Sequence, residues 1–291
     1  MSNIQKMRFW GTGAGEGIPT PFCRCRVCEY ARMNKGKDLR TRSSFRIDEK
    51  VMIDIGADFF AQSIMYLEDT FDVSHVLYTH THHDHFNKYM LLLRSIKRDD
   101  NRPKEPIHLY FSREGAKILE SVYKNPASYL REDFVQFHAL DFYETYQIGD
   151  YKVTPLKGHH ETDIENFAAN YLIEFKSGKK MYYALDSGLY LEETFEYLKN
   201  IKVDLLIGEC TFPIEKNSNA GHMTLTDEKL TLDRLWKQGT INKDTKIYLT
   251  HISGLERMHD EIAEYWDSLS TEYKVNVAYD GLSVMDEINM F

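Results

Sequence analysis

Short apolar runs alternate with amphipathic segments along the whole chain. Segments with apolar residues at helical spacing lie at 58–68, 86–97, 113–123, 190–199, 226–237 and 255–268. Apolar runs of strand length lie at 4–10, 43–48, 50–55, 75–79, 107–111, 151–156, 169–175, 180–185, 203–208, 246–250 and 274–279. Strand-rich stretches are thus interleaved with helices that must each bury one face. The pattern therefore predicts an α+β fold in which two sheets pack together and helices cover both outer faces.

Two turn signals predict hairpins. Asp48-Glu49-Lys50 separates the second and third apolar runs. Asp280-Gly281 separates the run at 274–279 from further apolar residues at 282–287. Asp-Gly between two alternating apolar segments is a strong hairpin signal, because both residues tolerate the backbone angles of a tight turn. We therefore expect one hairpin early in the chain and one at its end.

The segment at 226–237 carries its own boundary signals. Thr226 can cap the first turn with its hydroxyl oxygen, and Asp227 and Glu228 lie where the helix dipole favours negative charge. Gly239 follows the last apolar position and can end the helix. These signals predict a helix that begins at Thr226 and closes at Gly239.

Length and charge narrow the class of protein. A chain of 291 residues with 42% hydrophobic residues fits one large domain over residues 1–291. Its 36 basic and 45 acidic residues give a net charge of −9, which opposes attraction to a nucleic-acid backbone. One basic stretch runs from Lys88 to Lys104. We interpret it as a solvated helix face and loop, and a rim that steers phosphate groups is the alternative.

Sequence signals for targeting and the spacing of the cysteines indicate the cellular compartment of the protein. Residues Met1 to Arg8 lack the pattern of a signal peptide, and no apolar run approaches the roughly 20 residues that cross a bilayer. Cys23, Cys25 and Cys28 crowd together instead of spreading as a disulfide framework. We therefore expect a soluble, cytoplasmic protein that does not bind membranes.

A cluster of metal-ligand side chains directly follows the apolar run at 75–79. His80, His82, Asp84 and His85 lie within six residues of one another. Imidazole and carboxylate are ligands that borderline divalent metals prefer, and no packing need calls for such a cluster. Because alternate strand residues share a face, His80 and His82 can hold one metal while Asp84 and His85 begin a second site.

Further ligand types occur at the ends of three other predicted strands. The run at 151–156 leads to His159-His160, the run at 180–185 to Asp186, and the run at 246–250 to His251. A single Asp after a strand is commonly a turn former. Three such endings beside the first cluster indicate one shared metal centre at the strand ends.

Together these residues resemble the metallo-β-lactamase superfamily. The resemblance covers nearly the whole chain and rests on the His-x-His-x-Asp-His motif at 80–85, the later ligand positions and the opening Gly-rich turn at 11–17. It implies a four-layer αββα sandwich with the metals at the strand ends. The first metal would then be held by His80, His82 and His160, the second by Asp84, His85 and His251, with Asp186 bridging them.

The choice between two adjacent histidines also follows from this resemblance. Relatives place the ligand five residues after a Pro-Leu start, here Pro155. That spacing favours His160, and His159 is the alternative. The metals would be Zn²⁺ or Mn²⁺, with Fe²⁺ as a further alternative, because mixed imidazole and carboxylate ligands accept each of them.

Two segments in the second half of the chain narrow the branch of the family. Asp204–Glu209, followed by Gly221-His222-Met223-Thr224, resembles the phosphodiesterases of the superfamily, which include ribonuclease Z and the carbon–phosphorus lyase accessory phosphodiesterase. The resemblance implies that His222 lies near the metals and assists the leaving group. The alternative for His222 is a loop histidine that caps the following helix.

Cys23, Cys25 and Cys28 resemble the cysteine trio of the accessory phosphodiesterase and imply a structural Zn²⁺. In that relative a histidine three residues after the last ligand histidine completes the site, and Gly254 stands there in this chain. His259, Cys210 or a donor from a second subunit of a homodimer are alternatives for the fourth ligand. Three reduced, partly buried thiols without metal are the remaining alternative.

Several conspicuous residues receive lesser roles. The Gly-rich turn at 11–17 does not fit a dinucleotide-binding motif and is interpreted as a turn that lets the backbone approach the metals. Asp54 either orients a ligand histidine or the Gly-rich turn, or only shapes a turn. The histidines outside the motifs are predicted to be structural: His75, His83, His108 and His138.

The resemblance implies a dinuclear phosphodiesterase that hydrolyses a small or cyclic phosphodiester. A hydroxide held between the two metals would attack phosphorus, Asp84 and Asp186 would orient it, and protonated His222 would donate to the leaving alkoxide. The long basic arm of ribonuclease Z is not found in this sequence, which disfavours folded RNA as substrate. Two alternatives stay open. One is a lactone or thioester hydrolase of the same fold, and the other is a non-catalytic metal- or ligand-binding protein.

Overall fold

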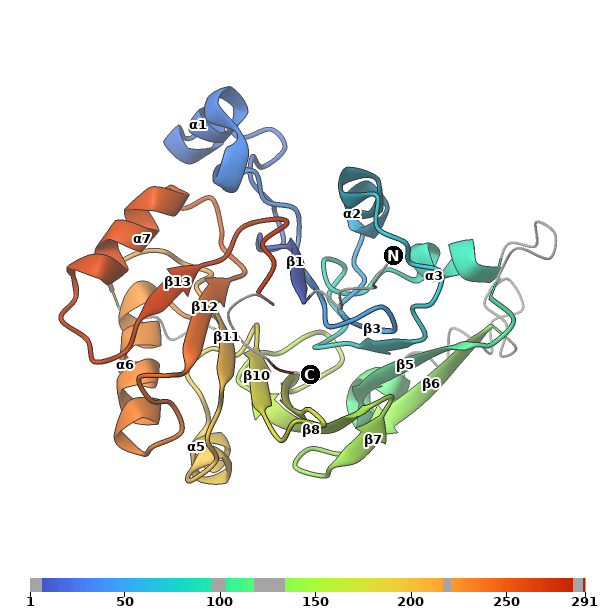
Figure 1. Cartoon of the computed structure of the whole chain (residues 1–291). Helices are drawn as coiled ribbons and strands as arrows, with labels where there is room; N and C mark the ends of the chain where they lie inside the picture. Colours follow the sequence, from blue (N-terminus) through green and yellow to red (C-terminus); the bar gives the residue numbers. More distant parts are fainter. Residues whose placement is uncertain (1–6, 96–102, 118–133, 217–220, 285–289, 291) are drawn as a thin grey trace.

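The computed structural model describes residues 7–95, 103–117, 134–216, 221–284 and 290. Its strands form two sheets (Figure 1). The first sheet has the order β1-β2-β3-β4-β5-β6, with bounds Arg8–Gly11, Ser44–Arg46, Val51–Ile53, His75–Leu77, Ile107–Ser112 and Val135–Leu140. Strands β3 to β6 run parallel, whereas β1, β2 and β3 pair antiparallel.

The second sheet has the order β13-β12-β11-β10-β9-β8-β7. Its bounds are, from β7 to β13, Tyr146–Ile148, Tyr151–Gly158, Ala168–Glu174, Lys180–Ala184, Leu205–Glu209, Lys246–Thr250 and Val275–Val277. Strands β10 to β13 are parallel, and β7 to β10 are antiparallel. Both sheets are therefore mixed, and β8, β10, β11 and β12 all end at the same edge.

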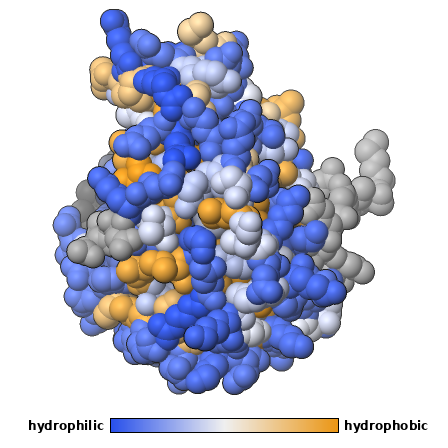
Figure 2. Space-filling view, turned by 90° about the vertical axis from the view of Figure 1, so that its left-hand side faces the viewer, coloured by the Kyte–Doolittle hydropathy of each residue, from blue (hydrophilic) through white to orange (hydrophobic). Residues whose placement is uncertain are grey.

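The helices cover the outer faces. Their bounds are α1 Arg26–Asn34, α2 Phe59–Tyr66, α3 Lys88–Ser95, α5 Glu192–Leu198, α6 Leu225–Lys237 and α7 His259–Ser268. Helices α2 and α3 lie on the side of the first sheet, and α5, α6 and α7 lie on the side of the second (Figure 1). Helix α1 projects above the body of the molecule in both views (Figures 1 and 2).

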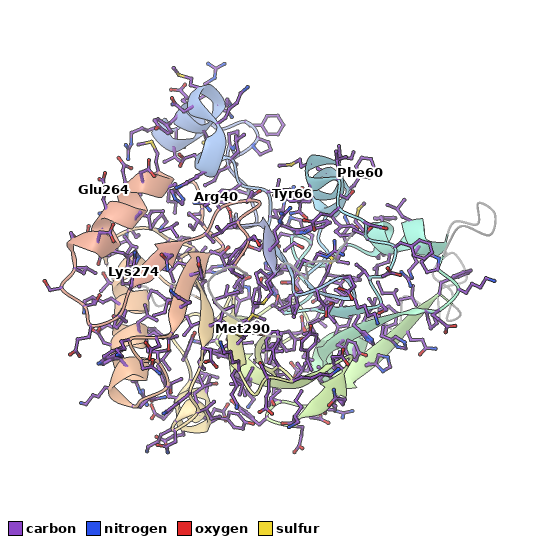
Figure 3. All side chains as sticks on the ribbon, in the orientation of Figure 1. Arg40, Phe60, Tyr66, Glu264, Lys274 and Met290 are labelled. Atoms are coloured by element: carbon purple, nitrogen blue, oxygen red, sulfur yellow. The ribbon has the colours of Figure 1, made fainter. Side chains whose placement is uncertain are left out.

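Three apolar cores separate these layers. Residues of both sheets share the central core, among them Phe45, Leu77 and Tyr183. Met290, from the end of the chain, also lies in that core near the middle of the molecule (Figure 3). The other two cores lie between each sheet and its helices. The four-layer αββα sandwich is thus confirmed, because each sheet buries both faces. The assignment of residues 1–291 to one domain stays a prediction.

The early hairpin is confirmed, and the late one is wrong. Strands β2 and β3 pair antiparallel around the predicted turn. Strand β13, however, pairs parallel with β12, and the chain after Asp280-Gly281 reaches β1, where the Phe9 amide donates to Leu282. Asp280 is held by Thr41 and Thr12, so the turn serves the contact between the sheets instead of a local hairpin. Residues 285–287 of that prediction lie outside the described residues.

The N-cap of helix α6 lies two residues earlier than predicted. Thr224 is its N-cap and forms a capping box, in which Thr224 accepts from the Asp227 amide and Asp227 accepts from the Thr224 amide. Thr226 lies inside the helix. Gly239 follows the last turn in a left-handed conformation, as predicted.

Other predictions are confirmed only in part. The basic stretch was predicted to be solvated, but Arg94 on α3 donates to the Val73 and Glu105 carbonyls. Lys97, Arg98 and Arg102 lie outside the described residues, as do 4–6 of the predicted first strand and 118–123 of a predicted helix. Strands β6 and β7 and helix α1 were not predicted.

The surface of the side that carries α5 to α7 is mostly hydrophilic, with apolar residues in separate patches (Figure 2). Exposed apolar side chains also occur on α2, where Phe60 points away from the body (Figure 3). In the part of the chain that the structure describes, no helix combines the length and apolar character needed to traverse a bilayer.

Candidate metal centre

The predicted ligand residues meet at one edge of the sandwich. Strand β4 leads to His80, β8 to His160, β10 to Asp186 and β12 to His251. These strands end in the same direction, so side chains just beyond them converge although they lie far apart in sequence. All seven predicted ligands belong to groups whose donor atoms lie within 4.8 Å of one another.

The first group consists of His80, His82 and His160. The Nε2 atom of His80 lies 2.9 Å from Nδ1 of His82, and Nε2 of His160 lies 3.2 Å from the same atom. Burial lowers the pKa of all three side chains, so their imidazoles are neutral at pH 7. Neutral imidazole nitrogens facing one another form a donor set that suits a divalent metal.

His160, and not His159, takes part in this group. His160 is buried, and its Nδ1 lies 3.0 Å from the carbonyl oxygen of Gly221. His159 is exposed, and its backbone amide donates to the carbonyl of Ser187. The strand β8 therefore turns His160 inward and His159 toward solvent.

The second group consists of Asp84, His85 and His251. Oδ2 of Asp84 lies 3.2 Å from Nε2 of His85 and 3.9 Å from Nε2 of His251. The Gly-rich turn packs directly on Asp84, since a β-carbon at Gly15 would lie 3.1 Å from Oδ2 of Asp84. The predicted approach of this turn to the ligand residues is present, and glycine is what permits it.

Asp186 lies between the two groups. Its Oδ2 atom is 2.8 Å from Nε2 of His85, 3.2 Å from Nε2 of His251 and 3.9 Å from Nε2 of His80. This oxygen is buried and accepts no hydrogen bond of normal geometry from any described residue. A buried carboxylate oxygen facing three imidazole nitrogens is a donor set that a divalent cation would stabilise. The residues present therefore fit divalent metal binding, with Asp186 in contact with donors of both groups.

The electrostatics of the centre agree with this fit. Burial by itself would raise the pKa of Asp186, but His251 and His85 hold it well below its usual range. Burial would lower the pKa of His85, but Asp84, Asp186 and Asp54 raise it. The centre thus concentrates carboxylate charge that binds a proton on His85 when no metal is present. Divalent cations would compete with that proton.

Strained backbone also marks the strand ends. Asp54, Asp186 and His251 have positive φ angles of 57°, 48° and 55°. Left-handed conformations are uncommon for residues other than glycine and are retained where the surroundings impose them. Each of the three side chains is buried and points into the metal centre or its support.

Asp54 contacts the ring nitrogen of His85 that faces away from Asp186. Its carboxylate accepts hydrogen bonds from the amide and hydroxyl of Thr79 at 2.8 and 2.9 Å. Its Oδ2 lies 2.8 Å from Nδ1 of His85, whose Nε2 faces Asp186. Of the two predicted roles, orientation of a ligand histidine matches these contacts, because the carboxylate fixes the ring of His85.

Glu165 supports the first group and was missed by the sequence analysis. It is buried, and it accepts hydrogen bonds from the amide of Thr81 at 2.8 Å and from the hydroxyls of Thr81 and Ser112 at 2.7 Å each. Thr81 stands between His80 and His82, so these bonds hold the spacing of the two ligands. A single glutamate in a loop after His160 carried no recognisable signal in the sequence.

His222 reaches the centre from a distant part of the chain. Its Nδ1 lies 3.0 Å from Oδ1 of Asp186 and 3.4 Å from Oε2 of Glu209. Burial alone would lower the pKa of His222, but contacts with Asp186 and Glu209 raise it to about 10. His222 does not cap helix α6, because Thr224 does. The side chain is therefore a protonated group at the edge of the ligand cluster.

Glu209 is the second residue that sequence reasoning missed. It was quoted in the phosphodiesterase-like segment, but no role was given to it. Its Oε1 accepts from the amides of Ser187 and Gly188 at 2.7 and 2.9 Å, which fixes the turn after Asp186. Its Oε2 faces His222. The carboxylate at the end of β11 thus orients both Asp186 and His222.

The remaining histidines lie elsewhere. His83 is exposed. His75, His108 and His138 lie on β4, β5 and β6, where His108 Nδ1 is 2.9 Å from His138 Nε2 and His75 stacks on His108. The structure therefore places these residues outside the metal centre, in contact with one another.

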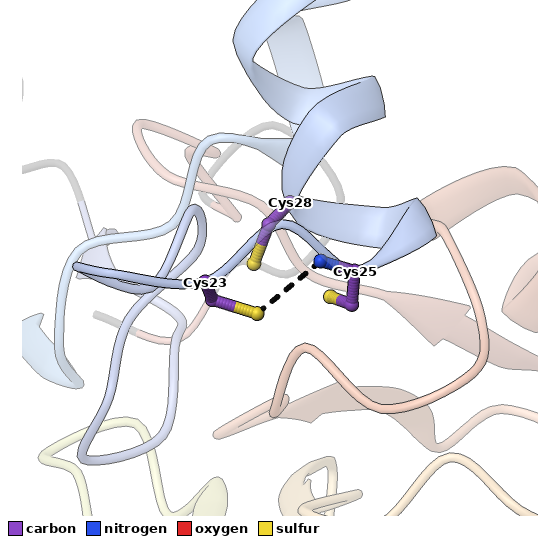
Figure 4. A group of neighbouring side chains, drawn as sticks. All are labelled: Cys23, Cys25 and Cys28. Carbon is purple, nitrogen blue, oxygen red and sulfur yellow. Dashed lines mark hydrogen bonds between the residues drawn. The ribbon is translucent and has the colours of Figure 1, made fainter.

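The three cysteines also come together (Figure 4). Cys25 is the N-cap residue of α1, and Cys28 is buried in the first turn. The Cys25 amide lies 3.4 Å from the sulfur of Cys23, and the sulfurs are within 4.8 Å of one another. Hydrogen bonding from the Cys28 amide lowers the pKa of Cys25, whereas burial raises the pKa of Cys28. The grouping agrees with the predicted trio, and zinc there stays a prediction.

Comparison with known proteins gives the following matches. A family model described as the Beta-lactamase superfamily domain matches residues 49–263. The fold resembles that of a diphosphatase from the PhnP family, with a TM-score of 0.70 and 23% identity over 96% of each chain. It also resembles Zn²⁺-bound PqqB from Methylobacterium extorquens, with a TM-score of 0.71 and 19% identity over 96% of this chain and 99% of that one.

A third solved structure, the short form of human tRNase Z, has a TM-score of 0.60 and 17% identity over 96% of this chain and 98% of that one. At such identities these likenesses concern the fold. The curated proteins include no significant match to the sequence.

Proposed function

The chain belongs to the metallo-β-lactamase superfamily, and we propose that it is a metal-dependent phosphodiesterase with a two-metal centre. In this proposal His80, His82 and His160 hold one divalent ion, Asp84, His85 and His251 hold the other, and Asp186 contacts both. Two such ions would supply a water of lowered pKa and positive charge next to the phosphate. Zn²⁺ and Mn²⁺ both suit the mixed imidazole and carboxylate ligands.

The contact of His222 with Asp186 and Glu209 is the observation that carries the proposal. Hydrolysis of a phosphodiester leaves an alkoxide, which departs more easily when it receives a proton. The side chain of His222 is 24% exposed, whereas that of Asp186 is 1% exposed, so His222 faces the side from which substrate enters. Two carboxylates at its Nδ1 keep it protonated, and its Nε2 remains to donate to the leaving oxygen.

The carboxylates perform a different task. Asp84 lies at the edge of the second group with 10% of its side chain exposed, and it would orient the attacking water by accepting a hydrogen bond from it. Asp54 holds the ring of His85 in place, and Glu165 holds the backbone between His80 and His82 through Thr81. These different roles agree with the burial of each residue. Asp84, which would contact the reacting water, is partly exposed, whereas Asp54 and Glu165 are buried.

We propose a small or cyclic phosphodiester as the substrate class. The net charge of −9 opposes binding of a long polyanion such as folded RNA. The solved structures of similar fold include a diphosphatase and a tRNase Z, which is consistent with phosphoester chemistry in the superfamily.

Hydrolysis by metal-loaded protein tests the proposal. We expect turnover of bis(p-nitrophenyl) phosphate and of cyclic phosphodiesters, with loss in Asp186→Asn and retention in Asp163→Asn, an exposed control in a nearby loop. Turnover of a lactone or thioester panel without phosphodiester turnover would favour the other hydrolase. A protein that binds two metals and stays inert on every ester class would favour a non-catalytic role.

A further inference from the structure

The cysteine trio lies apart from the two-metal centre, between helix α1 and the loop before α7. Figure 4 shows the three sulfurs turned toward one another at the start of α1. Cys28 accepts a hydrogen bond from the Thr20 amide at 3.3 Å, and the sulfur of Cys25 lies 3.7 Å from the carbonyl oxygen of Gly254. Gly254, from the second half of the chain, therefore lies beside the trio.

Gly254 stands where a fourth donor would complete the trio. A β-carbon at this position would lie 3.7 Å from the sulfur of Cys28, and its other nearest atoms, in Ile18 and Thr20, would be 3.8 Å away. These are ordinary van der Waals distances, and Gly254 is not among the glycines with a positive φ. Neither packing nor backbone conformation requires glycine here, yet the position offers no side chain.

The other fourth ligands expected from the sequence lie elsewhere. His259 is engaged with Arg40, whose Nη2 lies 3.0 Å from its Nδ1, and its amide donates to Asp38. Cys210 is buried in the core between the second sheet and its helices. Neither belongs to the trio's group, and no other described His, Cys, Asp or Glu joins it.

Solvent reaches the trio. Cys25 is exposed and Cys23 is partly exposed. A hollow of about 770 Å³ lies beside Cys23 and is lined by Phe22, Cys23, Arg24, Glu29, Arg32 and Met33. A small molecule can therefore approach the sulfurs from outside, and two of the lining residues are arginines that favour an anionic one.

We propose that the trio binds Zn²⁺ through three thiolates and leaves the fourth coordination position open to an external donor, such as a small anionic thiol. Structural zinc sites of proteins have four protein ligands, whereas three ligands leave an exchangeable position. The site is then a labile zinc that responds to small donors in solution, independent of the proposed hydrolytic function. A protein ligand at residue 254 would close it.

Cobalt substitution tests this inference on the full-length protein. Co²⁺ bound by thiolates gives a sulfur-to-metal charge-transfer absorption that the sulfur-free two-metal centre cannot give. We expect this absorption in the wild type and its loss in Cys25→Ser and Cys28→Ser. Addition of cysteine or imidazole should then shift the visible cobalt bands of the wild type, because the external donor replaces water at the open position.

Gly254→His supplies the missing ligand, and Gly254→Ala is its matched control. We expect the visible cobalt bands of Gly254→His to stay unshifted when cysteine or imidazole is added. The rate at which its thiolate-bound zinc transfers to a chromogenic chelator should be about tenfold lower than in the wild type, or lower still, since one added ligand strengthens the site. Gly254→Ala should behave as the wild type does.

Two results would overturn the inference. If the wild type loads its two-metal centre with cobalt but shows no thiolate absorption, the trio holds no metal. If the visible cobalt bands of the wild type do not shift on addition of cysteine or imidazole, a fourth protein ligand already occupies the fourth coordination position. Neither measurement depends on catalysis, so failure of the proposed phosphodiesterase activity would leave this test intact.

Discussion

The Nδ1 atom of His222 lies 3.0 Å from Oδ1 of Asp186, whose other oxygen faces histidines of both ligand groups. One carboxylate thus connects the proposed proton donor with the proposed metal positions. This contact ties the protonation of His222 to the charge at the metal centre, and it leads to the first two predictions.

Replacement of His222 by alanine should depend on the leaving group. Alkyl phosphodiesters need a proton on the departing oxygen, so their hydrolysis should slow by about 10²-fold or more. Activated aryl esters leave without a proton and should slow by much less. The check is a comparison of kcat/KM for both ester types at constant metal content. Equal losses on both esters would contradict the role of His222 as a general acid.

Glu209→Gln should move the pH profile instead of abolishing activity. Glu209 and Asp186 raise the pKa of His222 against the effect of burial, so His222 stays protonated well above neutral pH. Removal of one carboxylate charge lowers that pKa, and the proton is then lost at lower pH. Cations bound to Asp186 would reduce the effect of Asp186 on the pKa of His222, so the effect of Glu209 on that pKa would be the larger one. The alkaline limb for alkyl esters should therefore shift to lower pH, while aryl esters serve as the control.

Glu165→Gln should weaken the first metal position. The carboxylate accepts from the amide and hydroxyl of Thr81 and from Ser112, whereas glutamine has only one acceptor oxygen. His80 and His82 flank Thr81, so their metal affinity should fall about 10–100-fold, as is typical for residues that orient ligands. Chelator competition measures this, with the exposed Glu161→Gln as control. Parallel loss of both metals together with a lower Tm would indicate unfolding instead.

His259 should contribute to loss of stability in acid. Burial, with Arg40 and Lys37, lowers its pKa to about 3, whereas an unfolded chain has an ordinary histidine near 6.5. Between these values the unfolded state binds the proton, so stability is present above pH 6.5 and falls as pH drops toward 3. His259→Asn keeps an acceptor for Arg40 but cannot titrate. Urea unfolding at several pH values should show a smaller loss in the variant, and an equal loss would refute the assignment.

The start of helix α6 gives a prediction about stability. Thr224→Ala removes the cap hydroxyl that bonds Asp227 and should lower the free energy of unfolding by about 1 kcal/mol. Thr226→Ala, inside the helix, should change it by less than about 0.5 kcal/mol. Denaturant unfolding compares the two variants, and the reverse order would show that Thr226 is the effective cap.

Much of the candidate centre could be predicted because its metal-ligand residue types follow apolar runs. A strand is visible in sequence as a short apolar segment, and His80, Asp186 and His251 each come just after one. Parallel strands bring such positions to one edge, so spacing and residue type suffice to propose a shared site. The same reasoning did not identify Glu165 and Glu209. Glu165 follows no strand, and Glu209 resembles any glutamate that ends one.

The tertiary structure also decided cases in which local signals were ambiguous. The start of α6 is not such a case, because Thr224 and Asp227 already stand at the local spacing of a capping box. The Asp280-Gly281 turn is compatible with a hairpin, but Asp280 bonds to Thr41 and Thr12, and the chain continues to β1. The path of the chain after Asp280 depends on Thr12, Thr41 and β1, which lie far away in sequence, so no local pattern contains it.

The sequence by itself determined the alternation of strands and helices, because periodicity shows it. It also placed metal-ligand residue types at the strand ends, and the family resemblance carried by those residues implied the αββα class and the choice of His160. The tertiary structure decided which oxygen of Asp186 faces which histidine, that Glu209 holds His222, and that Gly254 lies beside the cysteines without a side chain. Those facts depend on distances of a few ångströms between segments distant along the chain. Only the packing of the two sheets sets such distances.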